Sequence, residues 1–109
     1  EEYTYVKADK KLQKVFFKDI YYIEGLKDYV IIKLADERIV TLQTMKSLSS
    51  KLPEKMFRRI HRSYIINLER IDAVYGNVVE MHIGKEEKHI PIGKNYREEL
   101  LELINKHKL

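Results

Sequence analysis

The sequence of 109 residues contains no cysteine and has only four glycines and two prolines. The absence of cysteine excludes disulfide bonds, thiolate metal ligands and a cysteine nucleophile. It is compatible with a reducing compartment, so we expect a cytoplasmic location. A chain of this length buries roughly two thirds of the surface that its unfolded form exposes, so it needs no covalent or metal staple.

Long apolar segments are also missing from the sequence. The longest, such as residues 29–32, are far too short to cross a bilayer, so we expect no membrane association. The N-terminus, EEYTYVKADKK, lacks the basic-then-apolar pattern of a signal peptide and has no initiating methionine, so we expect a domain cut from a longer protein. Since no repeat, low-complexity tract or linker interrupts it, we expect one domain over residues 1–109.

The positive charge is concentrated in one part of the sequence. The formal net charge is +4, from 21 lysines and arginines against 17 acidic residues. Residues 55–70 contain one lysine, four arginines and one acid, so this window holds the whole net charge and the remainder is balanced. The planar fork of arginine suits phosphate and guanine, which favours anion binding. A solvated strand face is the alternative.

Short apolar-rich runs separated by turn residues predict a mainly β protein of about ten short strands. One short internal helix is expected, with Thr44 as its cap and Pro53 at its end. A second, C-terminal helix is expected from residue 95, where Asn95 can cap it. Because the strands do not alternate with helices, a parallel α/β sheet is excluded. The strands are expected at 3–8, 12–17, 20–25, 29–34 and 38–43, within 57–68, on both sides of a hairpin turn at Gly76-Asn77, and at 89–93 after a turn at 84–88.

No pattern in the sequence indicates catalysis, a metal site or a cofactor. His82 and His89 could face each other across the turn at 84–88, but no third ligand stands at metal spacing. His61 and Ser63 offer a base and a hydroxyl, yet no acid is placed to orient the imidazole. There is no glycine-rich phosphate loop. We therefore expect a protein that is not an enzyme.

Four stretches, FRRIHRSYIINLERI, DIYYIEGLKDYVIIKL, TLQTMKSLSSKLP and IPIGKNYREEL, together resemble the LytTR family, the DNA-binding output domains of bacterial response regulators in two-component systems. The most specific is FRRIHRSYIINLERI, which is similar to the family's F-x-R-x-H-R-S-Y-x-x-N segment. DIYYIEGLKDYVIIKL resembles its I-E-x-x-x-x-Y-x-x-I pattern, TLQTMKSLSSKLP its short helix, and IPIGKNYREEL its closing P-x-S-R-x-Y stretch. The chain departs from the family at three positions: Arg58 replaces an apolar residue, Gly93 a serine and Lys94 an arginine.

The resemblance implies an elongated stack of small antiparallel sheets that lies across one face of double-stranded DNA. Loops, rather than a recognition helix, would enter successive major grooves. It further implies an N-terminal receiver domain in cis and tandem half-sites on the DNA. Since no coiled-coil seam is present, we expect the isolated domain to be monomeric and to pair on DNA.

The resemblance also assigns roles to individual residues. Arg62, Lys94 and Tyr29 are the candidates for base reading, and arginine can fork onto guanine O6 and N7. Apart from the resemblance, Asn67 is expected to satisfy a turn backbone rather than to touch DNA, because asparagine side chains commonly bond the backbone of turns. The candidates for contacting the DNA backbone or bracing the loops are Lys27, Lys55, Arg58, Arg59, His61, Ser63 and Asn95.

Two other functions fit the same residues. The chain could be a protein-interaction β module in which the basic strand is incidental. It could also bind single-stranded RNA by stacking bases on its tyrosines, of which it has eight. Preference for duplex over single strands, measured at two salt concentrations, separates these alternatives from duplex DNA binding.

Overall fold

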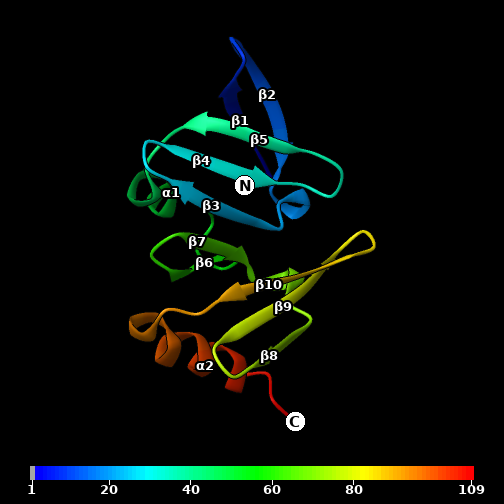
Figure 1. Ribbon diagram of the computed structural model, residues 1–109, viewed down its shortest axis with the longest axis vertical. Coiled ribbons are helices and arrows are strands. Elements are labelled where there is room, and N and C mark those ends of the chain that lie inside the picture. The colour runs from blue at the N-terminus through cyan, green and yellow to red at the C-terminus, as the bar shows by residue number, and fades with distance from the viewer. Residues whose placement is uncertain (1) are drawn as a thin grey trace.

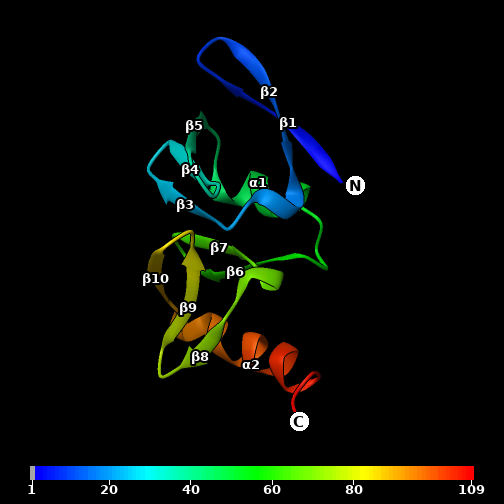
Figure 2. The ribbon, with the colours of Figure 1, turned by 90° about the vertical axis from the view of Figure 1, so that its right-hand side faces the viewer.

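A computed structural model describes residues 2–109, which form three antiparallel sheets stacked along the long axis (Figures 1 and 2). Its principal extents are 45 × 28 × 24 Å, so the expected elongated, mainly β stack is confirmed. No helix within residues 2–109 combines the length and the apolar character needed to cross a membrane. The strands are β1 (Tyr3–Ala8), β2 (Lys11–Phe16), β3 (Tyr22–Leu26), β4 (Tyr29–Lys33), β5 (Arg38–Leu42), β6 (Phe57–His61), β7 (Tyr64–Asn67), β8 (Ala73–Tyr75), β9 (Val78–Ile83) and β10 (Glu86–Pro91).

The central sheet has five strands in the order β5-β4-β3-β7-β6. A hairpin of β1 and β2 lies at one end of the stack, and a sheet of order β10-β9-β8 lies at the other (Figure 1). The helices are α1 (Met45–Lys51), which follows β5, and α2 (Arg97–Asn105), which packs near β6.

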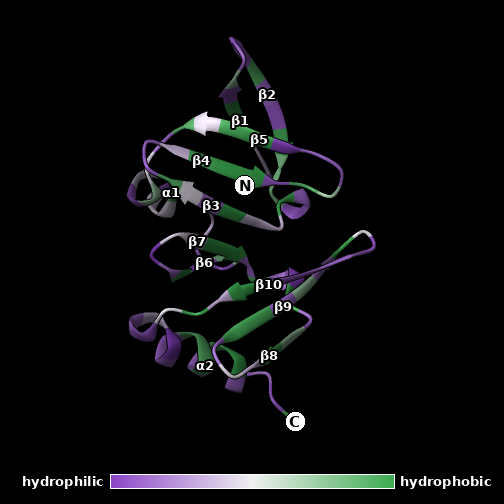
Figure 3. Ribbon diagram, viewed as in Figure 1, coloured by the Kyte–Doolittle hydropathy of each residue, from purple (hydrophilic) through white to green (hydrophobic). Residues whose placement is uncertain are grey.

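Two apolar clusters form the core, and β7 belongs to both. Ile65 packs in the cluster shared with the β1–β2 hairpin and α1, whereas Ile66 packs in the cluster shared with β9, β10 and α2. Successive side chains of a strand point to opposite faces, so a run of two apolar residues fits a strand that is buried on both faces. Figure 3 shows the resulting green segments along the strands, with purple at most turns.

The short helix forms as the sequence predicts. The side-chain hydroxyl of Thr44 accepts a hydrogen bond from the Ser47 amide at 3.0 Å, and Leu52 ends the helix just before Pro53. Gly25 on β3 lets the helix approach closely, because a Cβ there would come within 2.7 Å of Met45 Cγ.

Three details differ from the sequence expectations. The turn between β9 and β10 is only two residues long, so β10 begins at Glu86 rather than at residue 89. His82 pairs across the ladder with Glu87, and His89 with Glu80, so the two histidines are not cross-strand partners. Asn95 does not cap α2: it lies in a 3₁₀ turn, Lys94–Tyr96, which places the start of α2 two residues later without a side-chain cap.

Asn67 is fully buried and joins three segments of backbone. Its side-chain amide donates to the Ile20 carbonyl at 2.9 Å, and its side-chain oxygen accepts from the Glu69 amide at 2.9 Å. The sequence expectation that Asn67 satisfies a turn backbone is therefore confirmed. Buried polar groups left without a partner are costly, so this side chain stabilises the end of β7.

We expect Asn67→Ala to lower the free energy of unfolding by about 1–3 kcal/mol, because the Ile20 carbonyl and the Glu69 amide lose their partners. Urea denaturation measures the loss. Asn105→Ala, at the exposed end of α2, is the matched control and should change stability by about 0.5 kcal/mol or less. Equal effects of the two substitutions would contradict the role assigned to Asn67.

Candidate nucleic-acid interface

Three turns from distant parts of the sequence lie along one edge of the molecule. They are the β3–β4 turn at residues 27–28, the β6–β7 turn at 62–63, and the segment 92–96 between β10 and α2 (left side of Figure 1). All three proposed base-reading residues, Arg62, Lys94 and Tyr29, are exposed there. The structure thus places together side chains that are far apart in the sequence.

Two backbone hydrogen bonds join the outer turns to the middle one. The Gly25 amide at the end of β3 donates to the Ser63 carbonyl at 2.9 Å, and the Gly93 amide donates to the Ile60 carbonyl at 2.7 Å. The approach at Gly93 is tight, since a Cβ there would lie 3.0 Å from the Tyr96 ring and 3.4 Å from His61 Cα. The three turns are therefore parts of one connected edge.

Arg59 braces the middle turn from within. Its Nε donates to the His61 carbonyl at 3.4 Å, and its Nη2 donates to the Arg62 carbonyl. The β6–β7 register shifts between Arg59 and His61, so the turn departs from a regular hairpin. Together with the bonds from Gly25 and Gly93, all four carbonyls of residues 60–63 accept hydrogen bonds.

His61 and Ser63 also act within the turn. The Ser63 amide donates to Nδ1 of His61 at 3.0 Å, so that ring nitrogen acts as a hydrogen-bond acceptor, and the ring packs edge-on against Tyr64. Tyr64 in turn donates its hydroxyl proton to Glu24 at 3.3 Å. Burial, followed by the charge of Glu24, raises the pKa of Tyr64 above its usual value, so the phenol stays neutral.

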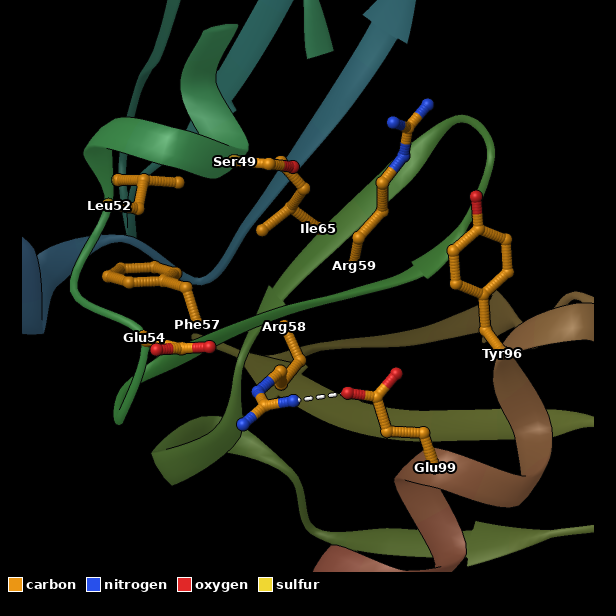
Figure 4. A pocket seen from close by; sticks show the side chains of 9 residues that line it. All are labelled: Ser49, Leu52, Glu54, Phe57, Arg58, Arg59, Ile65, Tyr96 and Glu99. Atoms are coloured by element: carbon orange, nitrogen blue, oxygen red, sulfur yellow. Dashed lines mark hydrogen bonds and ion pairs between the residues drawn. The ribbon is translucent and has the colours of Figure 1, made fainter. Parts of the chain in front are cut away.

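Arg58 has a different partner from its neighbour. Figure 4 shows its guanidinium meeting the Glu99 carboxylate of α2, with Nη1 and Oε2 2.5 Å apart, while Arg59 extends away from this pair. Side chains of adjacent strand residues point to opposite faces, which separates the two arginines. Arg58 ties β6 to the first turn of α2, immediately after the segment that carries Lys94.

The other candidates divide into two groups. Lys27 and Asn95 are exposed on the outer turns, and Lys27 adopts a left-handed backbone with φ of 53°. Lys55 lies two residues before β6 begins, at the end of that strand opposite to the Arg62 turn, so the structure does not place it with the others. Lys46 is an exposed cation that sequence reasoning missed; it follows Met45, which contacts Gly25 next to the β3–β4 turn.

Comparisons with known proteins identify related sequences. Residues 10–105 match the sequence model of the family described as the LytTr DNA-binding domain. The sensory transduction protein LytT of Bacillus anthracis is 32% identical over 98 residues, which cover 88% of this chain and 40% of that protein. The transcriptional regulatory protein YpdB of Escherichia coli K12 is 24% identical over 100 residues, covering 89% and 41%.

A solved structure has the same fold. A LytTr DNA-binding domain from Bacillus cereus superposes with a TM-score of 0.79 at 19% identity, over 95% of this chain and 97% of that one. The chain spans about two fifths of the length of the two curated relatives that it matches.

We expect Arg59→Lys to speed hydrogen exchange at the Ser63 and Gly25 amides roughly two- to tenfold, because a single ammonium nitrogen lacks the spacing of Nε and Nη2 that serves the two carbonyls, and a net hydrogen bond is worth about 0.5–1.5 kcal/mol. Amide exchange followed by NMR measures the change. Arg70→Lys is the matched control, since Arg70 bonds the Lys18 carbonyl elsewhere through two nitrogens. Unchanged protection in Arg59→Lys would remove the bracing role.

Proposed function

The chain belongs to the LytTR family of DNA-binding domains, and we propose that it binds double-stranded DNA sequence-specifically through the edge formed by its three turns. The observation that carries the proposal is the connected backbone of these turns, which holds exposed Arg62, Lys94 and Tyr29 along one side. A rigid edge suits base reading, because the geometry of the contacts is set before DNA binds.

Arg62 is the principal base-reading residue in this proposal. Its side chain is exposed and has no hydrogen-bond or ion-pair partner within residues 2–109, while its own carbonyl is held by Arg59. A guanidinium in this position is free to donate two hydrogen bonds to guanine O6 and N7. Lys94 and Tyr29 would read further bases from the outer turns, and Lys94 would discriminate less because a single ammonium lacks the planar fork.

The remaining candidates sort by their partners. Lys27 and Asn95 are exposed on the same edge and would contact the DNA backbone. The turn is braced by Arg59, His61 and Ser63. For these three residues, contact with phosphate would be a secondary role. We further infer that the three turns enter successive major grooves, as the resemblance to the family implies.

The biological setting proposed here is transcription control in a two-component system. The relatives that this chain matches are longer and carry the names of sensory transduction and transcriptional regulatory proteins. We infer a receiver domain joined in cis and two copies on tandem half-sites, with the isolated domain monomeric and without enzymatic activity. Preferred binding of single-stranded RNA, or no tight nucleic-acid binding, would instead favour the alternatives.

We expect Arg62→Ala to cost about 1–3 kcal/mol of binding free energy on the preferred duplex and much less on random duplex, because the base contact exists only in the specific complex. The preferred site comes from selection of bound sequences out of a random duplex pool. Arg62→Lys keeps the charge but loses the fork, so discrimination at one base pair should relax. Lys94→Ala should show a smaller effect at a different base pair.

The measurement is the affinity of each variant for a set of single-base-pair substitutions in the selected site, with circular dichroism as the fold control. Arg38→Ala is the matched control. Arg38 is an exposed arginine that pairs with Lys33, at the end of β5 that lies farthest from Tyr29. Equal losses on specific and random DNA would make Arg62 a phosphate anchor. No loss on either would remove the proposed interface.

Salt dependence tests which lysines touch phosphate. The logarithm of the binding constant should fall with the logarithm of salt concentration by about 0.9 per phosphate neutralised. We expect Lys27→Ala to make this slope shallower by about one, and Lys55→Ala, at the distant end of β6, to change it less. A total slope shallower than about −2 would contradict a grip with several backbone contacts.

A further inference from the structure

The face of the β8–β9–β10 sheet carries a quartet of alternating histidine and glutamate that the DNA-binding function does not use. On β9, Glu80 and His82 are two residues apart and share a face; on β10, Glu87 and His89 do the same. The register places His82 opposite Glu87 and His89 opposite Glu80. The four side chains therefore form a two-by-two array on a rigid ladder.

The donor atoms of this array are close together. Nε2 of His89 lies 2.9 Å from Oε2 of Glu87 and 3.7 Å from Oε1 of Glu80, and one donor atom of each of these three residues lies within 4.8 Å of the others. Nε2 of His82 lies 3.6 Å from the other oxygen of Glu87. Ligands at about 2.0–2.1 Å from a tetrahedral zinc ion are about 3.3 Å apart, and the observed distances bracket this value.

Neighbouring side chains hold both imidazole rings in place. The carboxylate of Asp72 lies 2.8 Å from Nδ1 of His82 and accepts the backbone amide of the same residue, so Nε2 is the nitrogen that faces Glu87. The ring of Tyr75 packs edge-on against His89. A carboxylate on the outer nitrogen of a histidine is the arrangement that orients histidine ligands in zinc sites.

The charge balance of the array also favours a cation. Within residues 2–109, the carboxylates of Asp72, Glu80 and Glu87 form ion pairs with histidines but with no lysine or arginine. Three negative charges thus gather around two weakly basic rings. Imidazole together with carboxylate suits zinc and its neighbours in the transition series, whereas magnesium prefers oxygen ligands alone.

We propose that this array binds a divalent transition-metal ion, with zinc the best fit, through the three donors that lie together, His89 Nε2, Glu87 and Glu80, and that His82 Nε2 moves in as the fourth ligand on binding. Asp72 positions His82 and is not itself a ligand. The hairpin of β9 and β10 points away from the three turns in Figure 1, so the metal would bind outside the proposed DNA interface.

Titration of the metal-free protein with zinc against a chromophoric chelator tests the proposal. We expect one zinc per chain, and His89→Ala and Glu87→Gln should each weaken binding by at least about tenfold. Asp72→Asn should weaken it by about tenfold through the orientation of His82. His107→Ala, which removes an exposed histidine after α2, should bind zinc as the parent does. Magnesium should not compete.

A second readout keeps the site assignment testable. Zinc should shift the backbone NMR signals of β9 and β10 and leave those of residues 60–63 unchanged, and circular dichroism should show the parent fold in every variant. Absence of saturable zinc binding would overturn the proposal, as would undiminished binding in His89→Ala or Glu87→Gln. Undiminished binding in His82→Gln would remove His82 from the ligand set. None of these outcomes depends on DNA binding.

Discussion

The hydrogen bonds to the four carbonyls of residues 60–63 set the geometry of the edge formed by the three turns. A hairpin turn normally exposes its carbonyls to water, but here each one accepts a hydrogen bond from protein: the Gly93 amide, two nitrogens of Arg59 and the Gly25 amide. With the carbonyls engaged by the body of the protein, the side chain of Arg62 is left exposed to solvent. The donors come from β3, β6 and the segment before α2, so the same bonds fix the relative positions of the three turns.

This turn can be rigid because the strands that carry it are buried on both faces. Ile65 and Ile66 face different apolar clusters, and on β6 Phe57 and Ile60 divide between the clusters in the same way. A movement of β6 or β7 would therefore disturb packing on two sides at once, and interiors packed at high density resist such shifts. The buried side chain of Asn67, with its two hydrogen bonds, holds the other end of β7. Because β6 and β7 are held in this way, the position of the short turn between them is fixed.

The sequence predicts the features that depend on local chemistry and misses those that depend on tertiary contacts. The Thr44 cap and the Gly76-Asn77 hairpin follow from neighbouring residues and are confirmed. The expected cap at Asn95 is wrong, because the contact of Gly93 with β6 tightens the chain into a 3₁₀ turn before α2 begins. Alternation along a strand predicts that Arg58 and Arg59 point to opposite faces. It does not predict their partners, which are the Glu99 carboxylate for Arg58 and carbonyls of the following turn for Arg59. The three-turn edge could be anticipated only from the family resemblance.

The partners of the arginines in residues 55–70 decide how much of the local positive charge is available to an external anion. Arg58 is neutralised by Glu99, Arg59 is committed to carbonyls, and Arg70 bonds the Lys18 carbonyl while its guanidinium lies over the Tyr21 ring. Of the four arginines in this window, Arg62 alone has no such partner within residues 2–109. The concentration of charge in the sequence therefore reflects chiefly contacts within the fold, and of these four arginines Arg62 is the one that contacts within the described residues 2–109 leave free to bind an external anion. In the proposed DNA complex, phosphate contacts would then come largely from lysines on and beside the outer turns, such as Lys27 and Lys46, which lie outside residues 55–70.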